Sequence, residues 1–184
     1  MVGQYSMFSK EAITRESEPY DFILGSVHFW IDNMFPSQMV ENNFPVDIAF
    51  ERYWEEVYKA VECGGFDAIA HIDFPKRYYK KSILSEVQMR DIFKVMVANN
   101  IALEINTSSL RKGLKESMPD KDFLKLYKDT GGIKVTLGSD AHRVKDLASG
   151  YNYARAIIME KLNSTVFINR RPKFEDELWR SCYE

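Results

Sequence analysis

The residues of this chain best suited to metal binding are its three histidines, His28, His71 and His142. Asp140 lies two positions before His142, and residues i and i+2 of an extended backbone point to the same side. Carboxylate oxygen and imidazole nitrogen together suit Zn, Mn or Fe. Asp140 could equally cap a helix and His142 could be an ordinary loop histidine. The spacing of these two residues alone therefore leaves both interpretations open.

Each histidine lies at or just after the C-terminal end of an apolar segment that predicts a buried β-strand. Strands are predicted at residues 20–29, 66–73, 101–107, 133–137 and 165–169, and helices at about 47–63, 85–100, 120–130 and 145–162. Apolar strands that alternate with amphipathic helices are typical of an α/β fold, a parallel sheet covered by helices. Such sheets carry their sites at the C-terminal strand ends, so the three histidines are expected at one edge.

Local signals place several element boundaries. Asp47 is the predicted N-cap of the first helix, and Gly64-Gly65 predicts its end because glycine accepts the left-handed conformation. Ser85 and Gln88 predict a capping box at the second helix. Residues 30–45 contain two prolines and predict a long loop. The apolar stripe of the first helix is expected in the core: Phe50, Tyr53, Trp54, Val57 and Val61.

The composition predicts one globular domain. The chain has 184 residues, of which 45% are hydrophobic, and we expect a polar N-terminal segment at residues 1–20 and a single domain at residues 21–184. A net charge of −2 gives no footprint for nucleic acid, and no apolar run approaches the ~20 residues of a membrane span. Two unclustered cysteines, Cys63 and Cys182, fit a reducing compartment, so a cytoplasmic protein is expected.

Further polar residues are expected beside the histidines. Asp73 follows His71 by two positions, and Glu104 and Asn106 lie on the strand that comes next in the chain. Any single histidine could be a satisfied core or loop residue. Three of them at equivalent strand ends, with carboxylates nearby, instead favour a hydrolytic metal centre.

Four segments together resemble the PHP (polymerase and histidinol phosphatase) family, and most of all its histidinol phosphatases. They are Gly-Ser-Val-His at residues 25–28, Ala-His-Ile-Asp at 70–73, Glu-Ile-Asn-Thr at 104–107 and Gly-Ser-Asp-Ala-His at 138–142. The resemblance covers about residues 20–175. It implies a partial (β/α)7 barrel of the PHP type, with metal ions at the C-terminal strand ends. It also implies that these ions activate a water, which attacks the phosphorus of a phosphomonoester.

The resemblance assigns roles to individual residues. It implies that His28 and His71 share one divalent metal ion (Zn, Mn or Fe) and that Asp140 and His142 serve two further metal positions. Phosphate-binding candidates follow from sequence position: Lys76 and Arg77 come soon after His71, and Arg143 follows His142 directly. Each of these three cations could hold an anionic substrate, and each could equally be ordinary solvated surface.

The chain also departs from the family pattern. The family opens with a His-x-His motif on its first strand and adds ligands from the next two strands, whereas this chain has none of these ligands. The strand at residues 22–28 would then present an open edge, which predicts a homodimer or larger oligomer. Three functions follow as hypotheses: a phosphoesterase acting on L-histidinol phosphate, a metal-binding or structural protein without turnover, and one part of a split enzyme.

Overall fold

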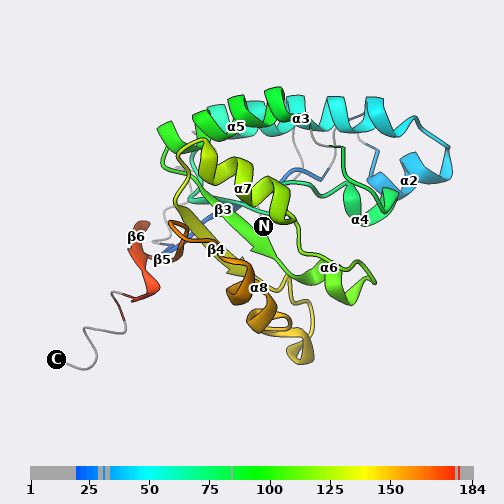
Figure 1. Cartoon of the computed structure of the whole chain (residues 1–184). Helices are drawn as coiled ribbons and strands as arrows, with labels where there is room; N and C mark the ends of the chain where they lie inside the picture. Colours follow the sequence, from blue (N-terminus) through cyan, green and yellow to red (C-terminus); the bar gives the residue numbers. More distant parts are fainter. Residues whose placement is uncertain (1–19, 29–30, 32–33, 84, 177, 179–184) are drawn as a thin grey trace.

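The computed structural model describes residues 20–28, 31, 34–83, 85–176 and 178, and its strands form one six-stranded sheet in chain order (Figure 1). The strands are β1 (Leu24–Gly25), β2 (Ala68–Ile69), β3 (Ala102–Asn106), β4 (Lys134–Gly138), β5 (Asn163–Ile168) and β6 (Arg171–Phe174). Strands β1 to β5 pair in parallel, and β6 pairs antiparallel with β5. This mixed α/β architecture agrees with the expected partial barrel of parallel strands. The predicted polar segment at residues 1–20 lies, except for Tyr20, outside the described residues.

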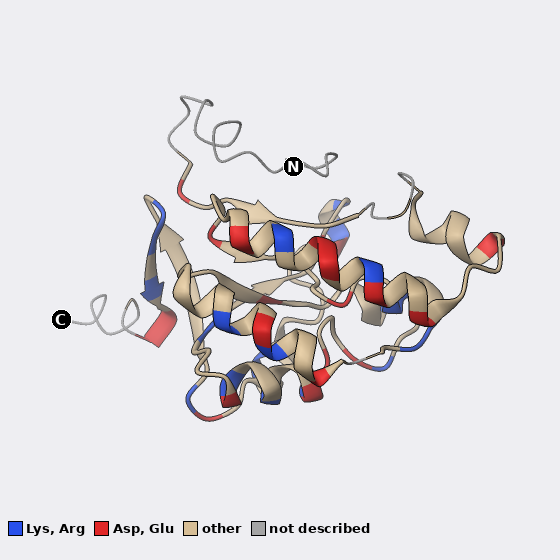
Figure 2. Ribbon diagram, turned by 90° about the horizontal axis from the view of Figure 1, so that it is seen from above, with Lys and Arg blue, Asp and Glu red and all other residues tan. Residues whose placement is uncertain are grey.

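Helices connect the parallel strands. They are α2 (Pro36–Glu41), α3 (Val46–Cys63), α4 (Lys76–Tyr79), α5 (Glu86–Ala98), α6 (Ser108–Arg111), α7 (Lys121–Asp129), the 3₁₀ turn η1 (Val144–Asp146) and α8 (Tyr151–Ile157). Helices α3, α5 and α7 pack in a row on one side of the sheet, and α8 packs against β4 (Figure 1). Charges of both signs are interspersed along the surfaces of the long helices (Figure 2). None of the described helices is long and apolar enough to cross a membrane.

The core lies between these helices and the sheet. All five residues of the predicted apolar stripe on α3 are buried, which confirms that interpretation: Phe50, Tyr53, Trp54, Val57 and Val61. Helix α3 ends where glycine was expected to end it, because Gly64 has a φ of 66° and its N–H donates to the carbonyl of Ala60. The N-cap is Pro45 and not the predicted Asp47, which instead lies in the first turn.

Several predicted elements differ from the structure. The helix predicted at residues 145–162 is wrong in its extent, since the chain forms η1, a turn and then the shorter α8. The hydroxyl of Thr107 donates to the carbonyl of Ser149 at 2.6 Å and draws this turn onto the end of β3. Gly150 fits the turn because its φ is 79° and a Cβ there would lie 2.7 Å from Thr107. A contact from a distant strand therefore overrides the local helical pattern.

The loop predicted at residues 30–45 contains helix α2. Pro36 occupies the first turn, where its missing N–H is no loss, and the backbone N–H of Phe35 donates to the side chain of Gln38 at 2.8 Å. At α5, Ser85 is the N-cap as expected, but its side chain makes no cap hydrogen bond, so the predicted capping box does not form. Strand β6 lies in what was expected to be a charged tail.

The sheet curves so that its last hairpin reaches its first strand. The N–H of Arg170, in the turn between β5 and β6, donates to the carbonyl of Asp21 at 2.9 Å. The Arg170 guanidinium also pairs with the carboxylate of Asp67 at 3.1 Å. Nearby, the rings of Phe22 and Phe167 lie 5.2 Å apart. These contacts join the C-terminal end of β5 to the segments just before β1 and β2, and a cavity lies at the C-terminal ends of β1 to β4.

Candidate metal centre

Two of the three histidines meet at the C-terminal ends of β1 and β2. The Nε2 atoms of His28 and His71 lie 3.3 Å apart. This distance suits a shared ion, because two nitrogens that each lie about 2.0–2.1 Å from one tetrahedral metal are about 3.3–3.4 Å apart. The parallel pairing of β1 and β2 brings them together, since the two strands are neighbours and end side by side.

Burial keeps both imidazoles neutral at pH 7. It lowers the pKa of His28, and together with the proximity of His28 and Arg77 it lowers the pKa of His71 to about 3. A neutral imidazole offers the lone pair that a metal ion requires, so no proton competes with the metal near neutral pH. The Nδ1 atom of His71 is buried and has no hydrogen-bond partner. The ring of His71 therefore lacks the outer partner that usually fixes a metal-binding histidine.

The backbone of His71 is fixed by Glu104 on the adjacent strand β3. The His71 N–H donates to Glu104 Oε2 at 2.9 Å, and the same oxygen accepts from the side-chain amide of Asn106 at 3.0 Å. Burial raises the pKa of Glu104 to about 7, although these hydrogen bonds lower it. A Cβ on Gly138 would collide with this carboxyl group. The glycine that opens the Gly-Ser-Asp-Ala-His motif is therefore required for the Glu104 side chain to fit.

Asp140 forms an ion pair with the side chain of Arg77. Its Oδ2 accepts from Arg77 Nη2 at 2.9 Å, and the same Arg77 nitrogen donates to the hydroxyl of Ser108. Burial would raise the pKa of Asp140, but the Arg77 hydrogen bond and charge outweigh it and the pKa is lowered. Arg111 braces the same loop through a hydrogen bond to the carbonyl of Ser139 at 2.7 Å. Asp140 is thus ionised and held against Arg77.

His142 differs from the other two histidines in its exposure. Its side chain is 72% exposed, and its Nδ1 lies 3.0 Å from the backbone oxygen of Asp140. Among the described residues, no group of three or more histidine, cysteine, aspartate or glutamate side chains is arranged to hold a metal ion. The structure therefore pairs His28 with His71, directs Asp140 to Arg77, and leaves His142 at the surface.

All four candidate ligands nevertheless line one cavity of about 800 Å³. Its polar lining at the open end comprises His28, His71, Arg77, Glu104, Asn106, Asp140 and His142. Alternate residues of the first strand region, among them Phe22 and Leu24, form part of its apolar wall. The cavity is thus polar where the strands end and apolar along the first strand region, an arrangement that suits a small ligand with a charged group.

The three phosphate-binding candidates lie in different surroundings. Arg77 lines the cavity. Lys76 is buried and donates to Asp120 Oδ2 at 2.7 Å, with Asp73 Oδ2 at 3.4 Å, so it belongs to an internal ion-pair network. Arg143 is exposed and precedes η1. Arg77 alone among these three borders the histidine pair.

Several residues of the site were not predicted as site residues. Glu104 and Asn106 were expected near this edge, but their hydrogen bonds to His71 and Ser108 were not. The alternation of polar residues in Glu-Ile-Asn, on a strand that is otherwise apolar, is the signal that could have identified them. Ser108 and Arg111 carry no comparable signal, because their roles depend on loops far away in the sequence.

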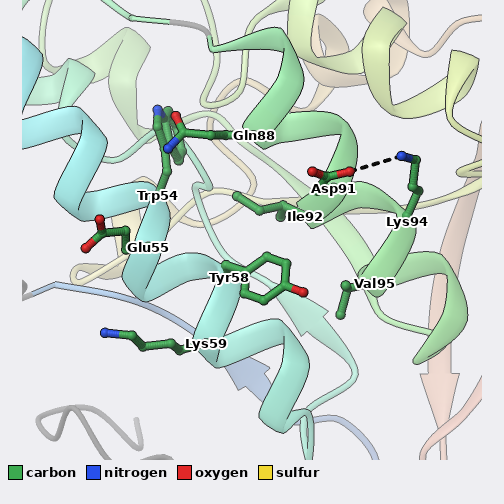
Figure 3. Close-up of a pocket in the computed structure, with 9 residues that line it drawn as sticks. All are labelled: Trp54, Glu55, Tyr58, Lys59, Gln88, Asp91, Ile92, Lys94 and Val95. Carbon is green, nitrogen blue, oxygen red and sulfur yellow. Dashed lines mark hydrogen bonds and ion pairs between the residues drawn. The ribbon is translucent and has the colours of Figure 1, made fainter.

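A second hollow lies between the outer surfaces of α3 and α5 (Figure 3). It has a volume of about 600 Å³, and Trp54, Tyr58, Ile92 and Val95 provide its apolar surface. Charged residues border it, including the ion pair of Asp91 and Lys94 at 3.0 Å. None of the candidate ligands lines this second hollow.

Comparisons with known proteins identify the family of the chain. The chain is 32% identical over 132 residues to a "Probable histidinol-phosphatase" of Thermotoga maritima, covering 71% of this chain and 52% of that protein. It is 31% identical over 163 residues to a protein of the same name from Clostridium acetobutylicum, covering 83% of this chain and 62% of that protein. The chain thus spans between half and two thirds of these curated relatives. The PHP domain pattern matches residues 5–108, which include His28, His71 and Glu104, and the chain belongs to the PHP family.

Proposed function

We propose that this chain is a metal-dependent phosphoric monoester hydrolase that converts L-histidinol phosphate and water to L-histidinol and phosphate. The observation that carries the proposal is the pair of neutral histidines, with Nε2 atoms 3.3 Å apart, in the cavity of a PHP domain. The substrate is suggested by the printed names of the relatives, which are histidinol phosphatases. Such an activity would serve histidine biosynthesis.

In this proposal His28 and His71 hold one divalent ion, Zn, Mn or Fe, while Asp140 and His142 serve further positions of the centre. A bound divalent ion supplies Lewis acidity, which activates water and offsets charge on a phosphoryl group. His28 and His71 provide the nitrogen ligands for this ion. Their imidazoles are neutral at pH 7 and so available as ligands, and burial of His71 keeps bulk water from its ring.

Arg77 is the residue that best fits a role in holding the phosphate. Its Nη2 binds Asp140 and Ser108, whereas its buried Nε has no hydrogen-bond partner. A guanidinium group offers paired donors that match two oxygens of a phosphate. Arg143, at the start of η1, could add charge from the surface. The apolar wall of the cavity would then contact the organic part of the substrate.

A second candidate function is a metal-binding or structural protein without turnover, or one part of a split enzyme. It is favoured by the absence, among the described residues, of any group of three or more ligand side chains arranged around one point. Two histidines alone would bind an ion weakly and leave most of its coordination to water or to another chain.

We also propose that the chain forms a homodimer or larger oligomer through β1. In the described part of the sheet β1 has β2 on one side and no strand on the other. Tyr20, Phe22 and Leu24 near this edge are 48%, 37% and 38% exposed. Light scattering at micromolar concentration should give a dimer or more, and Leu24→Lys should shift it toward monomer. The exposed Val87→Lys on α5 is the control, and a monomeric wild type contradicts the proposal.

The activity is tested with purified protein, L-histidinol phosphate and added Mn²⁺ or Zn²⁺. Phosphate release that is abolished by His71→Ala supports the phosphatase. Arg77→Met should weaken turnover, whereas the matched substitution Arg90→Met, in an exposed ion pair on α5, should not. About one bound ion per chain without phosphate release instead supports the second candidate.

A further inference from the structure

The imidazole of His71 contacts His28 and the ring of Phe74, and its orientation also depends on an unusual backbone conformation. The ring Nδ1 has no hydrogen-bond partner, and the residue has a φ of 27°, which L-residues with a Cβ rarely adopt. Such a conformation persists only where the surroundings impose it. The contact that can impose it is the 2.9 Å hydrogen bond from the His71 N–H to Glu104.

Glu104 is in turn held on three sides. Its Oε2 accepts from His71 and from Asn106, and its carboxyl group packs against Gly138 on β4. Strand register fixes these neighbours, because Asn106 lies directly opposite Gly138 in the parallel pairing of β3 and β4. The position of Glu104 is therefore set by the sheet itself and not by a mobile loop.

Hydrogen bonds continue from Asn106 toward the other side of the candidate centre. Asn106 Oδ1 accepts from the backbone N–H of Ser108 at 3.0 Å and from its hydroxyl at 2.6 Å. Because the Ser108 hydroxyl donates to Asn106, its oxygen is free to accept from Arg77. Arg77 then donates to Asp140 at 2.9 Å. Each of these hydrogen bonds has one donor and one acceptor, so the series of hydrogen bonds is continuous from the backbone of His71 to the side chain of Asp140.

We propose that Glu104, Asn106 and Ser108 are positioning residues, which hold His71 and Asp140 in a fixed relation across the cavity. The inference rests on the proposed function, because it concerns the same candidate centre. It assigns no contact with substrate to these three residues. Partners behind metal ligands typically affect metal affinity 10–100-fold, so their loss should be measurable even though the ligands remain.

The test uses the full chain and two measurements. Calorimetric titration with Co²⁺ gives the affinity for a divalent ion, and NMR in the absence of metal gives the rate of hydrogen exchange of the His71 amide. Glu104→Ala should weaken Co²⁺ binding about 10–100-fold and speed exchange of the His71 amide. Glu104→Gln keeps an acceptor oxygen and should restore most of both. Thr136→Val is the control, because Thr136 lies opposite Glu104 in the register and its buried hydroxyl makes no hydrogen bond.

Ser108→Ala separates the two halves of this series of hydrogen bonds, the half at His71 and the half at Arg77. It removes the hydroxyl that joins Asn106 to Arg77, while the backbone N–H of Ser108 still donates to Asn106. The His71 amide should therefore stay protected, and the NMR signal of the Arg77 Nε–H should change. Unchanged Co²⁺ affinity and unchanged exchange in Glu104→Ala would overturn the inference, as would a loss of thermal stability with no loss of affinity. If the wild type binds no Co²⁺, the proposed function fails, and the exchange data alone then decide whether Glu104 positions His71.

Discussion

Gly138→Ala should damage the candidate centre although Gly138 is not a ligand. The added Cβ would overlap the carboxyl group of Glu104, whose Cδ would lie only 2.7 Å away. The backbone at Gly138 is held by the Thr107 N–H at 2.8 Å, so the side chain of Glu104 must move instead. Movement of Glu104 breaks its hydrogen bond to the backbone of His71.

The magnitude follows from these two effects. Overpacking a buried position costs about 1–3 kcal/mol. Leaving the buried N–H of His71 without an acceptor costs roughly another 1–3 kcal/mol. We therefore expect Gly138→Ala to lower the free energy of unfolding by about 2–6 kcal/mol and to weaken Co²⁺ binding by about 10-fold or more.

Gly132→Ala is the matched control. Gly132 lies just before the N-terminal end of β4, whereas Gly138 lies at its C-terminal end, which borders the cavity. A Cβ on Gly132 would overlap the ring of Tyr127. Urea unfolding and calorimetric titration with Co²⁺ measure both variants. The control should lose stability but keep its Co²⁺ affinity. Equal affinities in both variants, or an unaffected free energy of unfolding in Gly138→Ala, would refute the reasoning.

Three other predictions follow from the structure. Burial raises the pKa of Asp73 from 3.8 to about 7, although Lys76 opposes this shift. Between about pH 4 and pH 7 the folded protein therefore holds a proton on Asp73 that the unfolded chain has lost. The free energy of unfolding consequently falls as the pH rises through this range. Asp73→Asn should therefore gain stability relative to wild type by about 1–3 kcal/mol more at pH 8 than at pH 4, and an equal difference at both pH values would contradict this. Arg77→Lys should raise KM for a phosphomonoester more than it lowers kcat, because lysine lacks the paired donors of the guanidinium group. Steady-state kinetics measure both constants, and a fall in kcat larger than the rise in KM would contradict this role of Arg77. Asp120→Asn should lower the thermal midpoint, because it weakens the buried pair with Lys76, and should leave Co²⁺ affinity unchanged.

The fold was predictable where local patterns and tertiary packing agree. Helix α3 has an apolar stripe at helical spacing and a glycine at its end, and both features appear in the structure. The segment at residues 145–162 has a helical pattern as well, but the hydrogen bond from Thr107 to Ser149 spans 42 positions and shortens the helix. Helix α2 was missed because a six-residue helix that begins with a proline resembles a loop.

The site was predictable to the extent that strand ends determine it. His28 and His71 converge because they follow neighbouring parallel strands, which the sequence pattern indicates. The partners of the charged residues could not be predicted in this way. Arg77 meets Asp140 across 63 positions, and Lys76 meets Asp120 across 44 positions. Such pairs depend on how loops fold over the strand ends, and residue types alone do not determine that.

The central claim is that His28 and His71 share one metal ion, and the three histidines of the chain allow a direct measurement. Titration with Zn²⁺, followed by NMR of the histidine rings and assigned with His→Gln variants, reports each ring separately. The account predicts that the signals of His28 and His71 shift together and are complete near one equivalent, while His142 follows later or not at all. A first response from His142, or no response from the pair, would contradict it.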